Sequence, residues 1–371
     1  MPLIAGRLGR IGLPVVAAAV ALAFAAAVTS AVLAATGANP LAAFRQMIGY
    51  GSQPDSVVNI INRGTTYYLS AVAVAIGFRM RLFNIGVDGQ YRLAAMLAAA
   101  FGGFVALPPV LHQAAVIVVA ALVGGLWAGI AGVLKVTRGV SEVISTIMLN
   151  FISTGIIAFL LRPNLFAVQV QGSNNIGTPP IPPSGRVPGF PLTGASIQVF
   201  GLVLLAVAVG VAFAVLVGRT RFGFDLRAAG LSPSAAVASG VNVPQMVVAT
   251  MVLSGAVAGL LGMPQLLGDS FTYALDFPTG LGFTGIAIAL LGRNHPVGIA
   301  FAALLWAFLD QSAQILDLFG IAKEIVIITQ ATVVLSVVVV YEVVHRFVLA
   351  QQQRAVGEQL GADERVAGAT A

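Results

Sequence analysis

Long apolar runs separated by short polar stretches make up most of this chain. A helix that crosses a bilayer needs about 20 apolar residues, and the pattern predicts ten such segments. The second and eighth are short, which is typical of broken helices along a transport pathway. The predicted segments are 11–35, 65–80, 90–106, 113–134, 143–161, 197–217, 244–264, 280–292, 297–316 and 324–345.

The first apolar run follows Arg7 and Arg10, as the core of a secretory signal peptide would. A signal-peptide core has roughly 7–15 apolar residues, and the run from 11 to 35 is longer. We therefore expect a first membrane helix that is kept in the mature protein.

Composition supports an all-α integral membrane protein. Of 371 residues, 58% are hydrophobic and 9% are charged, and the mean hydropathy is +0.97. Soluble domains carry roughly 25% charged residues, so this chain cannot cover a water-facing surface. The net charge of +6 is explained by cationic cytoplasmic loops, without nucleic acid as a partner. The chain has no cysteine, which excludes disulfides and thiolate metal sites.

Most of the 19 Lys and Arg residues fall on the cytoplasmic side if ten spans alternate from a cytoplasmic N-terminus. This predicts that both termini are cytoplasmic, in accordance with the positive-inside rule. Eight spans also fit, if the two short segments pair as re-entrant loops.

We expect a single transmembrane domain over residues 1–371 in two halves, 1–161 and 197–346. Between them lies a proline-rich extracytoplasmic loop, 162–196, which is either functional or a plain connector. The polar tail at 347–371 is expected to be disordered.

The halves contain one similar motif, Gly86-Val-Asp-Gly89 and Gly282-Phe-Thr-Gly285. Five predicted helices separate the copies, so the predicted halves have inverted topology. Chance in a chain with 42 glycines is the competing explanation.

The stretch "FNIGVDGQ" (83–90) places Asn84, Asp88 and Gln90 where the second segment ends and the third begins. Gly86 and Gly89 would permit backbone angles that other residues avoid. Asp88 suits a helix N-terminus. The stretch is either a polar cap on a broken helix or a cap that also gates a pathway, because ionisable groups within membranes are usually functional.

The eighth and ninth segments supply further candidates for the pathway. Polar residues at the outer end of the ninth segment either face an outer vestibule or pair with a neighbouring helix. The candidates are Gly282, Thr284 and Gly285 in the eighth segment and Asp310, Gln311 and Gln314 in the ninth.

The stretch 227–244 predicts a short cytoplasmic helix. Ser232 suits its N-cap, Pro233 its first position and Gly240 its end. So short a helix is unstable alone, so it either docks a cytoplasmic partner or rests on the membrane surface. The docking residues would be Arg227, Gly230, Ser232, Pro233, Ala235, Ala236 and Gly240.

The stretch "SEVISTIMLN" (141–150) is interpreted as mostly structural. Ser141 would cap the fifth segment with Glu142 in its first turn. Asn150 would bond a neighbouring helix.

No catalytic or metal-binding motif is recognised. The two lysines, Lys135 and Lys323, lie outside any phosphate-binding Gly-Lys-Ser/Thr sequence. The three histidines are not at metal-ligand spacing, and no Gly-x-Ser-x-Gly is present. We expect a transporter without an ATPase site, a metal or a bound cofactor. An intramembrane enzyme would lack a nominated nucleophile.

Four stretches resemble signature motifs of bacterial ATP-binding-cassette (ABC) importer permeases. They are "FNIGVDGQ", "SEVISTIMLN", "LRAAGLSPSAAVASGVNV" and "GFTGIAIALLGRNHPVG", and the resemblance runs from about 65 to 345. The most similar group is the simple-sugar and nucleoside branch, related to ribose and branched-chain amino-acid permeases. That family often has Glu at Asp88, Asn at Ser141, Gly-x-Asn-Pro at 230–233 and Asp at Thr284.

The resemblance implies a permease subunit of the bacterial inner membrane that carries a nucleoside or simple sugar. A cytoplasmic ABC ATPase that uses ATP would bind around 227–243, an extracytoplasmic binding lipoprotein would deliver the ligand, and a second permease would complete the pore. Alternatives are a branched-chain amino-acid permease, an exporter component, and an ion-coupled secondary transporter with Asp310 as its coupling carboxylate. The pore could be a homodimer or a heterodimer.

Overall fold

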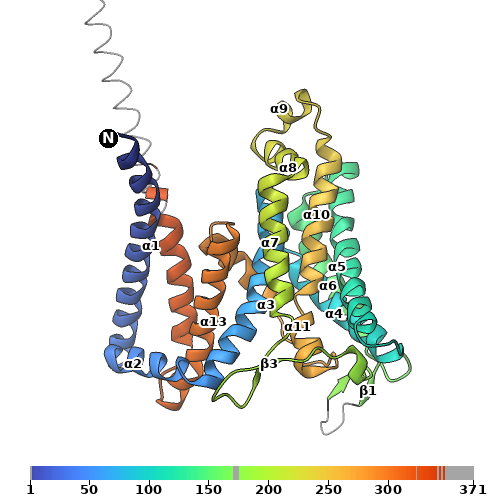
Figure 1. Cartoon of the computed structure of the whole chain (residues 1–371), viewed down its shortest axis with the longest axis horizontal. Coiled ribbons are helices and arrows are strands. Elements are labelled where there is room, and N and C mark those ends of the chain that lie inside the picture. The colour runs from blue at the N-terminus through green and yellow to red at the C-terminus, as the bar shows by residue number, and fades with distance from the viewer. Residues whose placement is uncertain (1, 170–174, 323, 341, 344–345, 347–371) are drawn as a thin grey trace, which may run out of the picture. The chain divides into compact units, whose positions relative to one another are not determined.

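The computed structural model describes residues 2–169, 175–322, 324–340, 342–343 and 346 (Figure 1), with side chains described from residue 19. The predicted disordered tail lies outside the described residues. The chain forms two compact units, which we describe separately. The terminal unit comprises 1–46 and 316–371, and the central unit comprises 47–315.

The chain is all-α apart from four short strands, as predicted, and each of the ten predicted segments contains a helix. By length and composition, four described helical stretches could cross a membrane, or six if each of two bent helix pairs is one span. The division into two inverted halves stays a prediction. The helices, turns and strands are α1 (Pro2–Ala35), α2 (Pro40–Gly51), α3 (Pro54–Arg79), α4 (Val87–Phe104), α5 (Leu111–Arg138), α6 (Glu142–Leu160), β1 (Val168–Gln169), β2 (Ile176–Gly177), η1 (Pro183–Gly185), β3 (Phe190–Pro191), β4 (Gln198–Val199), α7 (Val203–Arg219), α8 (Arg221–Leu231), α9 (Pro233–Ala238), α10 (Val243–Leu260), α11 (Met263–Gln265), the π-helical η2 (Leu266–Ser270), α12 (Leu281–Leu291), α13 (Pro296–Leu318) and a last helix at Glu324–Val340.

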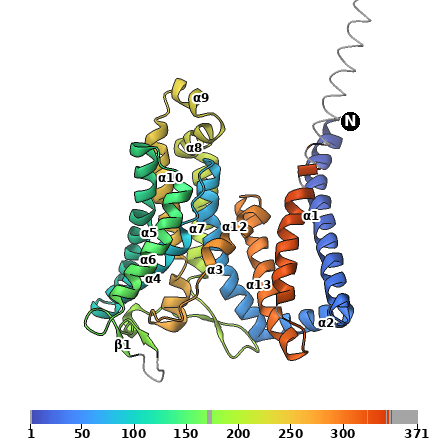
Figure 2. The ribbon, with the colours of Figure 1, turned by 180° about the vertical axis from the view of Figure 1, so that it is seen from behind.

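In the terminal unit, α1 lies beside the last helix (Figures 1 and 2). The hydroxyl of Thr29 donates to that of Thr329 at 3.0 Å, and both side chains are buried. Each hydroxyl also bonds a carbonyl oxygen four residues earlier in its own helix, and the contact between them links the two helices.

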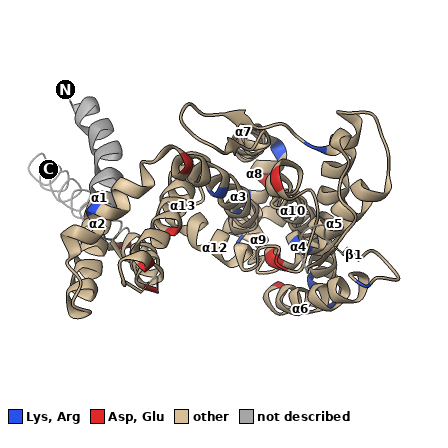
Figure 3. Cartoon of the chain, turned by 90° about the horizontal axis from the view of Figure 1, so that it is seen from below, with Lys and Arg blue, Asp and Glu red and all other residues tan. Residues whose placement is uncertain are grey.

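Helix α3 is the axis of the central unit. It packs against α7, α10 and α12, while α5 packs against α4 and α10 (Figure 2). From Thr65 to Ile76 its side chains are almost all buried, and many are small. Small side chains let neighbouring helices approach closely without a hydrophobic driving force. Figure 3 shows charged residues as isolated patches on the ribbon.

The proline-rich segment between α6 and α7 is anchored to the bundle. It pairs β1 with β2 and β3 with β4, both antiparallel. Backbone bonds tie it to the chain around η2: Thr178 N–H to Tyr273 O (2.9 Å), Ile181 N–H to Phe271 O (2.8 Å) and Val187 N–H to Leu267 O (2.8 Å). We call this end of the central unit the loop end. Helices α8 and α9 lie at the opposite end (Figure 1), which we call the α8–α9 end.

The structure corrects some predicted element boundaries. The second segment is expected to be short from 65, but α3 begins at Pro54, because polar residues that interrupt the apolar pattern lie on one face of the same helix. Helices α2 and α8 are not predicted. In α8, charged residues hide a buried face that includes Leu226 and Ala229.

Candidate translocation site

The two copies of the glycine motif meet where α4 and α12 begin. The backbone N–H of Gly282 donates to the Asp88 carboxylate at 3.4 Å, and the N–H groups of Gly280 and Leu281 also face it. A Cβ on Gly282 would press on the backbone of Asp88, so only glycine permits this approach. Asp88 therefore caps α12. Asp88 also lies in the first turn of its own helix, α4, as predicted.

The other polar residues of "FNIGVDGQ" form a closed buried network. Asn84 and Gln90 exchange two amide hydrogen bonds, at 2.9 and 2.8 Å, and are 1% and 0% exposed. Asn84 also donates to Ser254 of α10 at 2.9 Å, and Ser254 donates to Ala73 O of α3 at 2.7 Å. A buried network with its groups satisfied is rigid. Asn84 and Gln90 thus fix the start of α4 and have little capacity left for a ligand.

Gly86 and Gly89 do not adopt positive φ angles, so the predicted role in unusual backbone conformation is wrong. They allow close approach instead. Gly89 N–H donates to the side-chain oxygen of Asn150 at 2.9 Å, and the amide of Asn150 donates to Ile85 O at 3.0 Å. This confirms that Asn150 bonds a neighbouring helix.

At the start of α6, the predicted cap is absent, because Ser141 makes no side-chain capping bond. Glu142 is held by Lys135 at 2.5 Å and accepts from Phe83 N–H at 3.4 Å. The acidic side chain thus ties α6 to the end of α5 and to the stretch that leads into α4.

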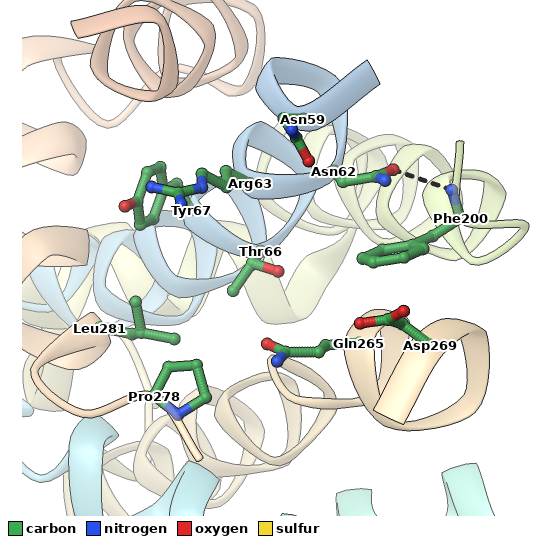
Figure 4. Close-up of a pocket in the computed structure, with 10 residues that line it drawn as sticks. All are labelled: Asn59, Asn62, Arg63, Thr66, Tyr67, Phe200, Gln265, Asp269, Pro278 and Leu281. Atoms are coloured by element: carbon green, nitrogen blue, oxygen red, sulfur yellow. Dashed lines mark hydrogen bonds between the residues drawn. The ribbon is translucent and has the colours of Figure 1, made fainter. Parts of the chain in front are cut away.

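A cavity of about 410 Å³ lies at the loop end of the central unit. Residues of α3 form one side, Phe200 another, and Gln265 and Asp269 of α11 and η2 a third (Figure 4). Its size is within the roughly 300–1,000 Å³ of ligand pockets. The π-helical turn η2 that carries Asp269 is a local geometry that recurs at functional sites.

Pro278 and Leu281 also line the cavity, and we call the segment 278–282 its floor. Tyr91 of α4 donates its hydroxyl to Pro278 O, and Ser70 of α3 donates to Leu281 O at 2.8 Å. One residue further on, Gly282 bonds Asp88. Three contacts from α3 and α4 thus hold this segment, so the motif copies adjoin the lining of the cavity.

The predicted pathway residues on α12 and α13 contact neighbouring side chains or their own helix. Gly285 packs against Ser70, and Thr284 donates to Gly280 O within its own helix at 3.4 Å. Asp310 accepts a hydrogen bond from the hydroxyl of Tyr67 on α3. Of the two alternatives for this residue, pairing with a neighbouring helix is therefore the one observed. Tyr50 contacts the side chains of Gln311 and Gln314.

At the α8–α9 end, the predicted short helix is present as α9. Ser232 accepts from Ala235 N–H at 3.4 Å, Pro233 is the first residue, and Gly240 follows the helix with φ +82°. Leu231 and Val237 are 73% and 59% exposed. These residues present an apolar surface.

Two of the predicted docking residues, Gly230 and Ala236, are buried and face the bundle. A Cβ on Gly230 would lie 2.6 Å from Arg79 O and 2.9 Å from the Cα of Met80. Gly230 therefore seats α8 on the end of α3. Arg227 is half-buried, and Pro233, Ala235 and Gly240 are exposed.

Sequence reasoning missed the cavity residues, although a signal was present. Asn59, Asn62, Arg63 and Thr66 recur at the three- and four-residue spacing of one helix face. Phe200, Gln265 and Asp269 come from irregular segments and carry no such pattern. Among the described residues, no three His, Asp or Glu side chains are grouped to hold a metal ion.

Discontinuous helices whose ends meet beneath a polar cavity are the construction of a membrane transporter. The chain belongs to the family described as "Branched-chain amino acid transport system / permease component", whose model matches residues 56–344. It is thus a multi-pass membrane protein of a permease family.

Curated relatives match over most of their length. The guanosine ABC transporter permease protein of Bacillus subtilis (strain 168) is 35% identical, covering 79% of this chain and 83% of that protein. The glucose ABC transporter permease protein of Haloferax volcanii is 32% identical, covering 76% of each chain. The nucleoside ABC transporter permease protein NupB of Lactococcus lactis is 29% identical, covering 86% and 89%. No solved structure matches the chain.

Proposed function

We propose that this chain is the permease subunit of an ABC importer and forms half of the pathway for a nucleoside or simple sugar. One observation carries the proposal: a polar cavity at the loop end is lined in part by Pro278 and Leu281, in a segment that Asp88 contacts at Gly282. The family and the named relatives support the same function. We place the loop end outside the cell and the α8–α9 end in the cytoplasm, with both termini cytoplasmic.

The coupling surface for a cytoplasmic ATPase consists of α9 with Leu231. Its apolar side chains are exposed at an end that we place in water, where such a patch marks a partner site. Gly230 and Ala236 do not contact the ATPase themselves. They pack α8 and α9 onto the bundle and so pass on the movement of these helices. The ATPase binds and uses ATP, and this chain binds no cofactor.

Membership of the permease family supports two further partners. An extracytoplasmic binding lipoprotein docks at the loop end, and a second homologous permease completes the pore. ATP binding moves α8 and α9, and the contact of Gly230 with Arg79 and Met80 carries this movement to the end of α3. The floor segment then separates from Asp88, and access to the cavity switches from the loop end to the α8–α9 end.

A ligand shifts such an equilibrium only by its different affinity for the two states. ATP supplies this difference, so the cavity need not bind its ligand tightly. An uncharged polar solute suits the lining, where Arg63 and Asp269 contribute one charge of each sign.

The test is affinity purification of the tagged chain from its native membrane, followed by identification of co-purifying proteins. An ABC ATPase should accompany the wild type and be lost with Val237→Asp. Val140→Asp is the matched control, because Val140 is also exposed but lies in the turn between α5 and α6. If folded wild-type protein carries no ATPase under any nucleotide condition, the proposal is wrong.

A further inference from the structure

The cavity is lined by polar side chains whose hydrogen-bonding groups are unused. Within the described part of the chain, the side chains of Asn59, Gln265 and Asp269 make no hydrogen bond or ion pair. Burying such groups without partners is costly, so a ligand that enters the cavity must satisfy them. The nearby Asn62 is different, because both its side-chain oxygen and its side-chain nitrogen are hydrogen-bonded.

Asn62 fixes the aromatic wall of the cavity. Its side-chain oxygen accepts from Phe200 N–H at 2.8 Å and its amide donates to Gln198 O at 3.0 Å (Figure 4). On another side, Gly268 lies so close that an added Cβ would be 2.9 Å from the Phe200 ring. The ring is therefore held in place before any ligand arrives, which lowers the entropic cost of stacking on it.

The lining favours one class of neutral ligand. A simple sugar has a hydroxyl on most carbons and would leave several of them facing Phe200, Pro278 and Leu281 unpaired. A nucleoside instead offers a flat base for the aromatic ring, since every base has a π-face. It also offers a polar base edge and a few sugar hydroxyls for the amides and the carboxylate.

We propose that this cavity binds an intact, uncharged nucleoside, with its base stacked on Phe200. Gln265 and Asp269, which lie next to that ring (Figure 4), bond the polar edge of the base. Asn59 and Thr66, on α3, meet the sugar hydroxyls. This assignment rests on the proposed permease function and names the residues that hold its substrate.

Saturation-transfer NMR on the purified chain, without any binding protein, tests the site directly because it detects weak binding. The probes are guanosine, uridine, ribose and glucose. Wild type should saturate guanosine and uridine more than the sugars. Phe200→Leu should weaken the nucleoside signal about tenfold, while Phe200→Tyr keeps it. Asp269→Asn should also weaken the signal. Phe190→Leu is the matched control, an exposed Phe in the same loop.

Uptake by the complete importer separates the two proposals. If nucleosides are imported but Phe200→Leu and Asp269→Asn, eluting as wild type on gel filtration, bind like wild type, the cavity assignment is wrong and the permease function stands. If ribose or glucose gives the stronger signal at this site, the nucleoside class is wrong. If no solute is imported and no ATPase associates, the proposed function itself fails.

Discussion

The contact between Asp88 and the start of α12 is the part of the site whose removal has the clearest consequence. Asp88→Leu deletes the acceptor that faces the N–H groups of Gly280, Leu281 and Gly282. Loss of a helix cap costs about 1 kcal/mol, and a hydrogen bond to a charged group contributes about 1.5–3 kcal/mol. We therefore expect the closed floor to lose about 2 kcal/mol, a shift of roughly 30-fold in its equilibrium with the open form.

The chain has no cysteine, so one introduced cysteine reports on the floor alone. Leu281→Cys keeps the backbone oxygen that accepts from Ser70. With Asp88→Leu added, a membrane-impermeant thiol reagent applied from the α8–α9 side should label it faster, and solute uptake per ATP hydrolysed should fall.

Two further variants are the controls. Asp88→Glu keeps the charge and should label near the wild-type rate. Asp276→Leu removes a carboxylate that is exposed on the same segment and makes no hydrogen bond among the described residues, so it should change neither readout. If Asp88→Leu folds, transports and labels like wild type, Asp88 does not hold the floor.

Two other predictions concern the ends of α3. Gly230→Leu should lower the thermal unfolding midpoint of the purified chain by the equivalent of about 2 kcal/mol, a typical cost of overpacking, because the new side chain would clash with the backbone of Arg79 and Met80. Ala235→Leu, at an exposed position, should leave the midpoint unchanged. Equal midpoints for the two variants would show that Gly230 does not pack against α3. At the loop end, the hydroxyl and N–H of Ser196 donate to Asp55 and hold the pKa of its carboxyl below the ordinary value of 3.8. This tether is complete above that value and is lost as pH falls through the lowered pKa, so hydrogen exchange around Ser196, corrected for intrinsic rates, should accelerate below about pH 4 in wild type; an Asp55→Asn variant with the same pH dependence would contradict this.

The sequence predicted the helical class and the motif stretches because both depend on local patterns. Apolar runs of membrane length and the Ser232-Pro233 start of α9 are visible in a few consecutive residues. The start of α3 was missed for the opposite reason. Its first turns carry Asp55, Asn59 and Asn62, which interrupt an apolar pattern but lie along the cavity and the loop.

Partners distant in sequence could not be predicted. Asp88 suits a helix start, and nothing in "FNIGVDGQ" indicates that the helix it caps begins about 190 residues later, at Leu281. Likewise, the sequence predicted that Gly230 docks a partner, whereas its lack of a side chain allows α8 to approach Met80 closely. These roles depend on tertiary packing, which one sequence does not reveal.

The capping contact under the cavity also gives the two glycine motifs unequal duties. The first copy contributes the carboxylate of Asp88, whereas the corresponding Thr284 of the second bonds Gly280 within its own helix. The contact between the two copies is therefore asymmetric, with the acceptor on the first copy and the N–H donor on the second. Exchanging the two residues would leave the composition unchanged yet remove the carboxylate in front of α12, so the two copies are not interchangeable.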